Sequence, residues 1–210
     1  MKVAVLGASG WVGSHVLAEL QQRQLETVGL VRQPTDSIKG EVRVLDVMDA
    51  SVDYETLLAD VDIVISAVAA RAENNHEIFA EAANRLLAVL PSTQVKRLVW
   101  VGGAGSLEVA PGVPLVSVPD FPEEYKDEAL GQSQALEVFR AFTGELEWTF
   151  VSPAAELVPG EKQSQYRTTT DQLLSDAEGR SWISVADFAY ALVDEVVEGK
   201  YLNQRIGFAY

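Results

Sequence analysis

The hydrophobic residues of this chain occur in short apolar runs that alternate with segments of helical periodicity. The first run, residues 2–7, is apolar without alternation, which is typical of a strand that is covered on both faces. In the segment that follows, Val16, Leu17 and Leu20 fall on one side of a helix, while polar residues fall elsewhere. The hydrophobic period therefore changes from that of a strand to that of a helix near Trp11.

This alternation repeats through most of the chain. Right-handed crossovers between parallel strands place helices on both faces of a sheet, so the alternation favours a doubly wound parallel sheet. We predict an α/β fold of the Rossmann type. The predicted strands are residues 2–7, 27–32, 41–45, 62–68, 97–102, 147–152, 181–183 and 205–210. The predicted helices are residues 11–24, 52–59, 73–90, 125–142 and 185–198.

The alternation of strands and helices ends in the C-terminal third, where Pro153 ends a strand and polar residues fill positions 160–170. Residues of about 153–185 are expected to form a small C-terminal lobe that faces the substrate. A long loop that contains glycine and proline is expected at 103–122. Since no repeat and no linker rich in Pro, Gly or Ser divides the chain, we interpret residues 1–210 as one domain.

The charge balance narrows the classes of function. The 31 acidic residues exceed the 16 basic residues, and the net charge of −15 repels phosphate backbones and anionic lipid surfaces. Nucleic acids and membranes are therefore not expected as partners, and no apolar run reaches the roughly 18 residues of a membrane span. The absence of cysteine and the presence of two histidines, His15 and His76, argue against thiolate chemistry and a metal site. We expect a cytoplasmic protein.

A glycine-rich turn lies where the first strand ends and the first helix begins. Glycines at such a junction allow a tight turn and a close approach of backbone to a pyrophosphate, and the helix N-terminus offers N–H groups and a positive dipole end. The G-x-x-G-x-x-G spacing also occurs in ordinary strand-to-helix turns, but its place in a parallel α/β pattern favours dinucleotide binding. The predicted contacts are Gly7, Ala8, Ser9, Gly10, Trp11, Val12 and Gly13.

The second strand ends in Val31 and Arg32, beside the expected position of the adenosine ribose. In NAD-binding proteins an acidic residue at this place accepts hydrogen bonds from the ribose hydroxyls, and none is present here. The guanidinium of Arg32 is suited to pair with the 2′-phosphate of NADP, whereas the simpler interpretation is a solvated surface arginine. We therefore expect NADP(H) as the cofactor.

Two further strand ends face the same crevice, because ligands of open α/β sheets bind outside the carboxyl ends of the strands. Asp46 and Val47 are expected at the adenine, as a hydrogen-bond acceptor and a packing surface, although Asp46 is equally able to cap a turn or a helix. Ser66, Ala67 and Val68 are expected beside the cofactor, since the small Ser66 and Ala67 allow it to pass close to the backbone.

Several motifs along the chain form a combined pattern. They are GASGWVG (7–13), VR (31–32), LDV (45–47), VISAV (64–68), VGGAGSL (101–107) and ISVADFAYALVDEV (183–196). The pattern spans essentially the whole chain and resembles the atypical short-chain dehydrogenase/reductase group, within it the NmrA-like NAD(P)H-binding proteins. The resemblance implies an NADP-binding fold whose C-terminal lobe and loop after VGGAGSL enclose the nicotinamide. It also implies kinship with NADH-flavin and biliverdin-type reductases.

The resemblance exposes a departure on the helix after that loop. Reductases of the superfamily carry Tyr-x-x-x-Lys there, where the tyrosine supplies a proton and the lysine lowers its pKa. The matching stretch here is LGQSQ, residues 130–134, which contains neither residue. Reduction of an ordinary carbonyl needs that proton, whereas a flavin, quinone or bilin acceptor delocalises the incoming charge and takes its proton from water.

Other side chains admit two interpretations each, so the catalytic residues stay unassigned. Ser106 either bonds the nicotinamide or substrate or caps a turn. Tyr125 either supplies a proton or belongs to the solvated start of a helix. The aromatic residues that either line a flat acceptor pocket or belong to the core are Trp11, Phe121, Tyr166 and Trp182.

Two functions are compatible with these residues. The first is an NADPH-dependent oxidoreductase that transfers hydride to a flavin, quinone, bilin or similar conjugated acceptor without the Tyr-x-x-x-Lys pair. The second, which the resemblance also implies, is a non-catalytic NADP(H)-binding redox sensor. The missing tyrosine and lysine favour the sensor, and the intact C-terminal lobe favours the enzyme.

Overall fold

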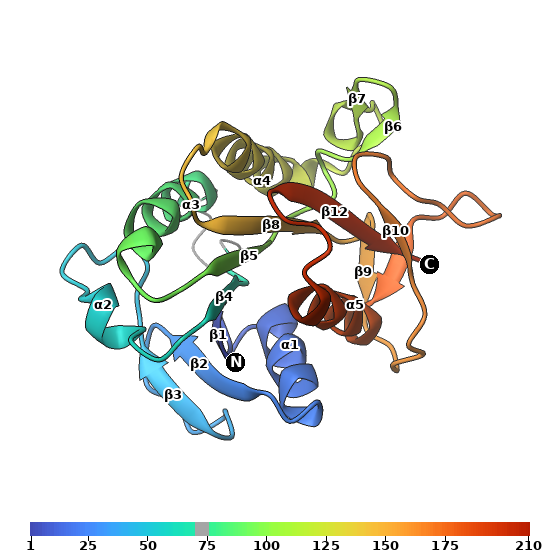
Figure 1. Ribbon diagram of the computed structural model, residues 1–210. Helices are drawn as coiled ribbons and strands as arrows, with labels where there is room; N and C mark the ends of the chain where they lie inside the picture. The colour runs from blue at the N-terminus through green and yellow to red at the C-terminus, as the bar shows by residue number, and fades with distance from the viewer. Residues whose placement is uncertain (70–75) are drawn as a thin grey trace.

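A sheet of eight strands forms the centre of the computed structural model, which describes residues 1–69 and 76–210 (Figure 1). All neighbouring strands are parallel except the pair at one edge, which is antiparallel. This arrangement confirms the predicted α/β fold with a doubly wound parallel sheet. In spatial order the strands are β10 (Arg167–Thr169), β12 (Gln204–Ala209), β8 (Glu147–Ser152), β5 (Arg97–Val101), β4 (Ile63–Ser66), β1 (Lys2–Leu6), β2 (Glu26–Val31) and β3 (Glu41–Val44).

Helices cover both faces of the sheet (Figure 1). On one face lie α1 (Trp11–Gln22) and α5 (Val185–Glu198), which pack against each other and against a cluster that we call the α1/α5 core. On the other face lie α2 (Tyr54–Leu57), α3 (Ile78–Val89) and α4 (Glu123–Ala141), over a cluster that we call the α3/α4 core. The inner strands of the central sheet therefore have apolar neighbours on two sides.

The continuous apolar runs in the sequence are explained by these two cores. Successive side chains of a strand point to opposite faces of a sheet. In β4, Val64 belongs to the α3/α4 core, whereas Ile63 and Ile65 belong to the α1/α5 core. A strand in this position needs apolar residues at every place, so its pattern does not alternate.

Two small sheets stand outside the central one. The predicted loop at 103–122 contains an antiparallel pair, β6 (Glu108–Ala110) and β7 (Val113–Pro114), followed by a 3₁₀ turn at Leu115–Ser117. Within the predicted lobe of 153–185, β9 (Glu156–Val158) pairs with β11 (Trp182–Ser184), whereas β10 joins the central sheet. The lobe is therefore divided between a small sheet of its own and the edge of the main one.

The boundaries of the other elements agree with the predictions to within a few residues. The first residues of the helix predicted at 73–90 lie outside the described residues, and α3 begins at Ile78. A 3₁₀ turn, Leu90–Ser92, follows it. Among residues 1–69 and 76–210, none of the helices combines the length and hydropathy that a bilayer span requires.

Candidate functional site

The carboxyl ends of four neighbouring strands bring the predicted cofactor contacts to one edge of the sheet. The strands β4, β1, β2 and β3 are adjacent and parallel, so the residues that follow them lie side by side (Figure 1). The glycine-rich turn follows β1, Arg32 follows β2, Asp46 and Val47 follow β3, and Ala67 and Val68 follow β4. The tertiary structure thus gathers positions that are widely separated in sequence.

Gly7 adopts a conformation and a position that exclude a side chain. Its φ is +80°, in the left-handed region that glycine tolerates, and its N–H donates to the carbonyl of Leu30 at 3.1 Å. A Cβ built at this position would lie 2.5 Å from the carbonyl oxygen of Ala67, which is backbone and has no freedom to move aside. The first glycine therefore holds the turn against the neighbouring strand end.

Gly13 sets the distance between helix α1 and the turn. A Cβ at this position would lie 2.2 Å from the carbonyl oxygen of Gly7. Gly10, the middle glycine, closes the turn by donating its N–H to Gly7 O at 2.9 Å, and its added Cβ would meet that oxygen alone, at 3.2 Å. The outer side of the turn, at the exposed Ser9 and Gly10, is therefore open to a ligand.

Helix α1 begins at this turn without a cap from the chain. Gly10 is the N-cap residue, and in the part of the chain that the structure describes no side chain caps the helix there by accepting a hydrogen bond from its first N–H groups. The first turn of α1 also carries no acidic residue. The first N–H groups of a helix lack partners within the helix and mark the positive end of its dipole. Trp11 is exposed and Val12 is half-buried beside them, whereas Ala8 is buried in the α1/α5 core. An open, glycine-lined helix start fits a diphosphate.

The residues after β2 and β3 differ in how they meet solvent. Arg32 is exposed directly after the last residue of β2. Asp46 is exposed, and its carboxylate accepts from the N–H of Met48 at 2.9 Å, which is the turn-capping role that the sequence left open. The side chain of Val47 is 5% exposed and packs in the α3/α4 core. Contact of Arg32, Asp46 and Val47 with a cofactor stays a prediction.

The end of β4 contributes backbone more than side chains. Ala67 and Val68 are half-buried, and their backbone atoms are the ones that a Cβ at Gly7 would meet. The hydroxyl of Ser66 is completely buried on the α3/α4 side and has no hydrogen-bond partner among the described residues. Passage of a cofactor over these residues stays a prediction that the close packing at Gly7 supports.

Ser106 is held by the only basic residue of β12. Arg205, 5% exposed, donates to both the carbonyl and the hydroxyl of Ser106, at 2.9 and 3.0 Å, and forms an ion pair with Asp171. Burial lowers the pKa of Arg205, while the Asp171 carboxylate opposes that shift. Ser106 thus has a structural partner that fixes the loop after β5.

Tyr125 is exposed in the first turn of α4. Its neighbour Lys126 forms an ion pair with Glu123 at 3.3 Å on the helix surface. This is the arrangement of a solvated helix start, and a role of Tyr125 as a proton donor stays unassigned.

Gln132 is a buried polar residue that the sequence prediction missed. It is 6% exposed, and its amide oxygen accepts from the indole N–H of Trp100 at 3.0 Å. The buried positions of α4 include Ala135, Leu136 and Phe139, at helical spacing from Gln132. A glutamine at a place where this spacing predicts an apolar residue is the signal that was available in the sequence.

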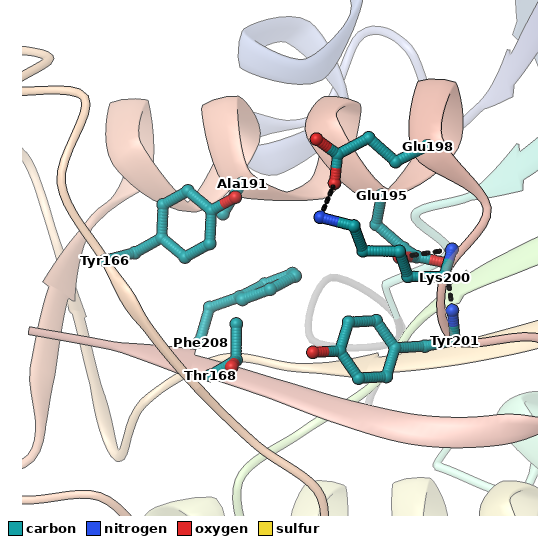
Figure 2. A pocket seen from close by; sticks show the side chains of 8 residues that line it. All are labelled: Tyr166, Thr168, Ala191, Glu195, Glu198, Lys200, Tyr201 and Phe208. Carbon is teal, nitrogen blue, oxygen red and sulfur yellow. Dashed lines mark hydrogen bonds and ion pairs between the residues drawn. The ribbon is translucent and has the colours of Figure 1, made fainter.

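The aromatic residues proposed as a pocket lie in different places. Trp182 packs edge-on against Tyr210 at 4.6 Å between ring centroids, and Tyr166 packs against Tyr190 and Phe208. Tyr166 lines a small cavity of about 60 Å³ between α5, β10 and β12, next to the Glu198–Lys200 ion pair (Figure 2). This cavity shares no lining residue with the predicted cofactor site.

Fold and turn together define the class of dinucleotide-binding α/β proteins: a parallel sheet, a glycine turn packed against the next strand, and an uncapped helix start. A family model described as NAD(P)H-binding matches residues 7–196, which include every predicted cofactor contact. The chain belongs to this NAD(P)H-binding family, and the resemblance drawn from the sequence motifs is confirmed.

Individual relatives cover the chain from end to end. The protein YwnB of Bacillus subtilis, whose function is uncharacterized, is 34% identical over 98% of this chain and 96% of its own length. A solved structure from Burkholderia pseudomallei, provisionally named as an exported protein, is 37% identical, with a TM-score of 0.92 and full coverage of both chains. One from Streptococcus pneumoniae, provisionally named an NADH-flavin reductase, is 33% identical over 100% of this chain and 99% of its own, with a TM-score of 0.90.

Proposed function

We propose that this protein is an NADPH-dependent reductase that transfers hydride to a flavin, quinone or bilin-like conjugated acceptor. The observation that carries the proposal is the glycine turn, where added Cβ atoms at Gly7 and Gly13 would meet backbone at 2.5 and 2.2 Å. Such a turn supports the binding of a diphosphate at the N-terminus of α1. Membership of the NAD(P)H-binding family and the likeness to the streptococcal protein named an NADH-flavin reductase support the same activity.

The chain's own residues divide the binding of the cofactor between them. The first N–H groups of α1 bind the diphosphate, and Arg32 pairs with the 2′-phosphate, which distinguishes NADPH from NADH. The backbone at Ala67 and Val68 lies beside the turn. In this proposal the nicotinamide extends from there toward the ends of the neighbouring strands β4 and β5. When bound, NADPH supplies a hydride from its nicotinamide ring.

The choice of a conjugated acceptor rests on the absence of a tyrosine and a lysine at the matching position of α4. The stretch at 130–134 holds no tyrosine or lysine, so α4 provides no ionisable proton donor at the position where the superfamily has one. In the proposed reaction the acceptor gains one hydride from NADPH and one proton from water, and NADP⁺ is released. A conjugated ring spreads the charge of the incoming hydride, so it tolerates a proton that arrives from solvent.

The same departure supports a second candidate, an NADP(H)-binding redox sensor without turnover. In that case NADPH binds as tightly, and the chain passes on the redox state of the nucleotide through a partner. The two candidates share the cofactor site and differ in whether the acceptor is reduced.

The proposal has two further parts. The chain is organised as a single domain, and its location is the cytoplasm, where NADPH is regenerated.

Two measurements test the proposal. Oxidation of NADPH is followed by its absorbance with FMN, menadione and biliverdin as acceptors. Turnover with at least one of them is expected, and tight NADPH binding without any turnover would instead support the sensor. The absence of heat with either NADPH or NADH in calorimetry would remove both candidates.

The cofactor preference is tested with Arg32→Asp. We expect roughly 10- to 100-fold weaker NADPH binding, about 1.4–2.8 kcal/mol, with little change for NADH. Lys39→Asp makes the same change of charge in the loop after β2 and serves as the control. Equal losses for NADPH and NADH, or an equal effect of Lys39→Asp, would contradict a specific role of Arg32.

A further inference from the structure

Three buried side-chain atoms at the carboxyl end of the sheet lack a hydrogen-bond partner in the described residues. They are Ser66 Oγ, Ser152 Oγ and His76 Nδ1. A fourth, Arg97 Nε, belongs to the buried ion pair of Arg97 with Glu195 at the amino end. A buried polar atom without a partner destabilises the fold, so three of them at one end of the sheet call for a ligand or water as their partner.

The two serines lie on the same face of the sheet. Ser66 is two residues after Val64 in β4, and Ser152 is two residues after Phe150 in β8. Val64 and Phe150 both belong to the α3/α4 core. Because every second residue of a strand points to the same face, both hydroxyls point toward α3 and α4, on either side of β5.

Gln132 of α4 adds a donor group with a fixed orientation. An indole N–H only donates, so the Gln132 atom that meets Trp100 is the amide oxygen, and the NH₂ group points away from Trp100. Within residues 1–69 and 76–210 this NH₂ group donates to no other residue. Trp100 has no exposed surface, so its packing holds the amide in this orientation.

Close contacts hold α4 against the turn before α3 and against the end of β5. A Cβ at Gly131 would lie 2.5 Å from the carbonyl oxygen of His76, which places α4 directly against the turn before α3. A Cβ at Gly103 would lie 3.4 Å from Cβ of Gln132, which places this side chain over the end of β5. We call Ser66, His76, Gln132 and Ser152 the polar cluster.

We propose that the polar cluster is the acceptor subsite and that the NH₂ group of Gln132 donates to a ring carbonyl of the acceptor. This inference rests on the proposed reductase function. The cluster contains no carboxylate, lysine or arginine, so it suits an uncharged ring edge. An edge that carries a carbonyl beside an N–H, as in the imide of a flavin or the lactam of a bilin, matches a group of neutral donors and acceptors. A quinone, which has carbonyls without N–H, uses fewer of these groups.

The test compares Gln132→Met with Gln134→Met, the same substitution at an exposed position of the same helix. Binding of riboflavin to the protein saturated with NADP⁺ is measured by quenching of flavin fluorescence, and NADP⁺ binding is measured by calorimetry. Gln132→Met is expected to weaken riboflavin binding roughly tenfold or more, about 1.4 kcal/mol, with NADP⁺ binding unchanged. Gln134→Met is expected to change neither.

Gln132→Glu keeps the acceptor for Trp100 and serves where Gln132→Met does not fold. A covered carboxyl group has a raised pKa, donates when protonated and repels a carbonyl when ionised. Riboflavin binding to this variant is therefore expected to weaken as the pH rises through that pKa, while binding to the unchanged protein does not. A structural role of Gln132 alone predicts no such pH dependence.

The outcomes separate this inference from the function on which it rests. Unchanged riboflavin affinity in both Gln132 variants, in a protein that reduces flavin, overturns the subsite and leaves the reductase standing. An unchanged protein that binds NADP⁺ but neither riboflavin, biliverdin nor menadione overturns the reductase and the subsite together. Tight binding of biliverdin but not riboflavin, lost in Gln132→Met, assigns the subsite to a bilin.

Discussion

The two ends of the central sheet are built from different kinds of side chain. At the amino end, charges are paired: Lys2 binds Glu41 at 2.6 Å and Asp60 at 2.7 Å, and Arg97 binds Glu195 and the hydroxyl of Thr149. At the carboxyl end, glycines pack backbone against backbone, and three buried atoms of the polar cluster lack partners among the described residues, namely the hydroxyls of Ser66 and Ser152 and the ring nitrogen Nδ1 of His76.

We infer from this difference that the amino end of the sheet contributes to stability and that the carboxyl end contributes to ligand binding. Hydrogen bonds from Arg43 and Lys2 hold the pKa of Asp60 well below its usual value, and hydrogen bonds from Lys2 and Arg43 lower that of Glu41. Groups paired in this way have little capacity left for a ligand. Groups at the other end retain their hydrogen-bonding capacity, which is what a binding site requires.

The largest expected effect comes from breaking the amino end. Arg97→Met leaves the buried carboxylate of Glu195 without its cation, and we expect a loss of about 3–5 kcal/mol in the free energy of unfolding. Lys96→Met, which removes a cation that is 78% exposed at the adjacent position, is expected to cost less than about 1 kcal/mol. Denaturant unfolding measures both. NADPH affinity of the folded Arg97→Met protein is expected to be unchanged. A parallel loss of affinity would contradict the assignment of stability to the amino end and of binding to the carboxyl end.

A smaller effect on stability but a direct one on binding is expected from Gly7→Ala. Gly7 and Gly179 have similar positive φ values, +80° and +82°, but nothing lies within 4 Å of a Cβ at Gly179. Gly179→Ala therefore measures the strain of the left-handed conformation alone, about 1–2 kcal/mol. Gly7→Ala adds the clash with Ala67 O, so it is expected to cost more and to weaken NADPH binding at least roughly tenfold. Equal melting temperatures for the two variants would refute the close packing of the turn.

The smallest expected effect concerns Tyr166, which is not part of the predicted cofactor site. Burial, together with its hydrogen bond to Asp194 at 2.7 Å, raises the pKa of Tyr166 above its usual value. The folded state thus keeps a proton that the unfolded chain loses near pH ~10, so this stabilisation is present below that pH and is lost as the pH rises further.

Tyr166→Phe isolates this contribution, because the other tyrosines titrate alike in both proteins. The variant is expected to be less stable by about 0.5–1.5 kcal/mol near neutral pH, and the difference is expected to shrink above pH ~10. Denaturant unfolding across this range gives the difference directly, and a gap that stays constant with pH would argue against the hydrogen bond as its cause. NADPH affinity is expected to be the same in both proteins.

Elements with strong local signals could be predicted, and elements that depend on pairing could not. Strands such as β4 were visible because both of their faces are buried, which demands apolar residues throughout. The edge strand β10, Arg-Thr-Thr, is short and mostly exposed, so its residues carry no such pattern. It becomes a strand through its antiparallel pairing with β12, which is distant in sequence.

The candidate site divides along the same line. The glycine turn was predictable because its constraint is local: a left-handed φ and tight packing within a few residues restrict the side chain to hydrogen. The orientation of Gln132 was not, because it depends on Trp100 from another element. Likewise, nothing local to Ser106 indicates that Arg205 holds it.

The sequence by itself determined the order of the buried strands and the helices, the position of the dinucleotide turn and the absence of the Tyr-x-x-x-Lys pair. The tertiary structure decided which strand ends lie side by side, which charges are buried in pairs and which polar side chains are buried without a partner. The physical reason is that periodicity and backbone sterics act over a few residues, whereas burial and hydrogen bonding depend on neighbours that only the folded chain brings together.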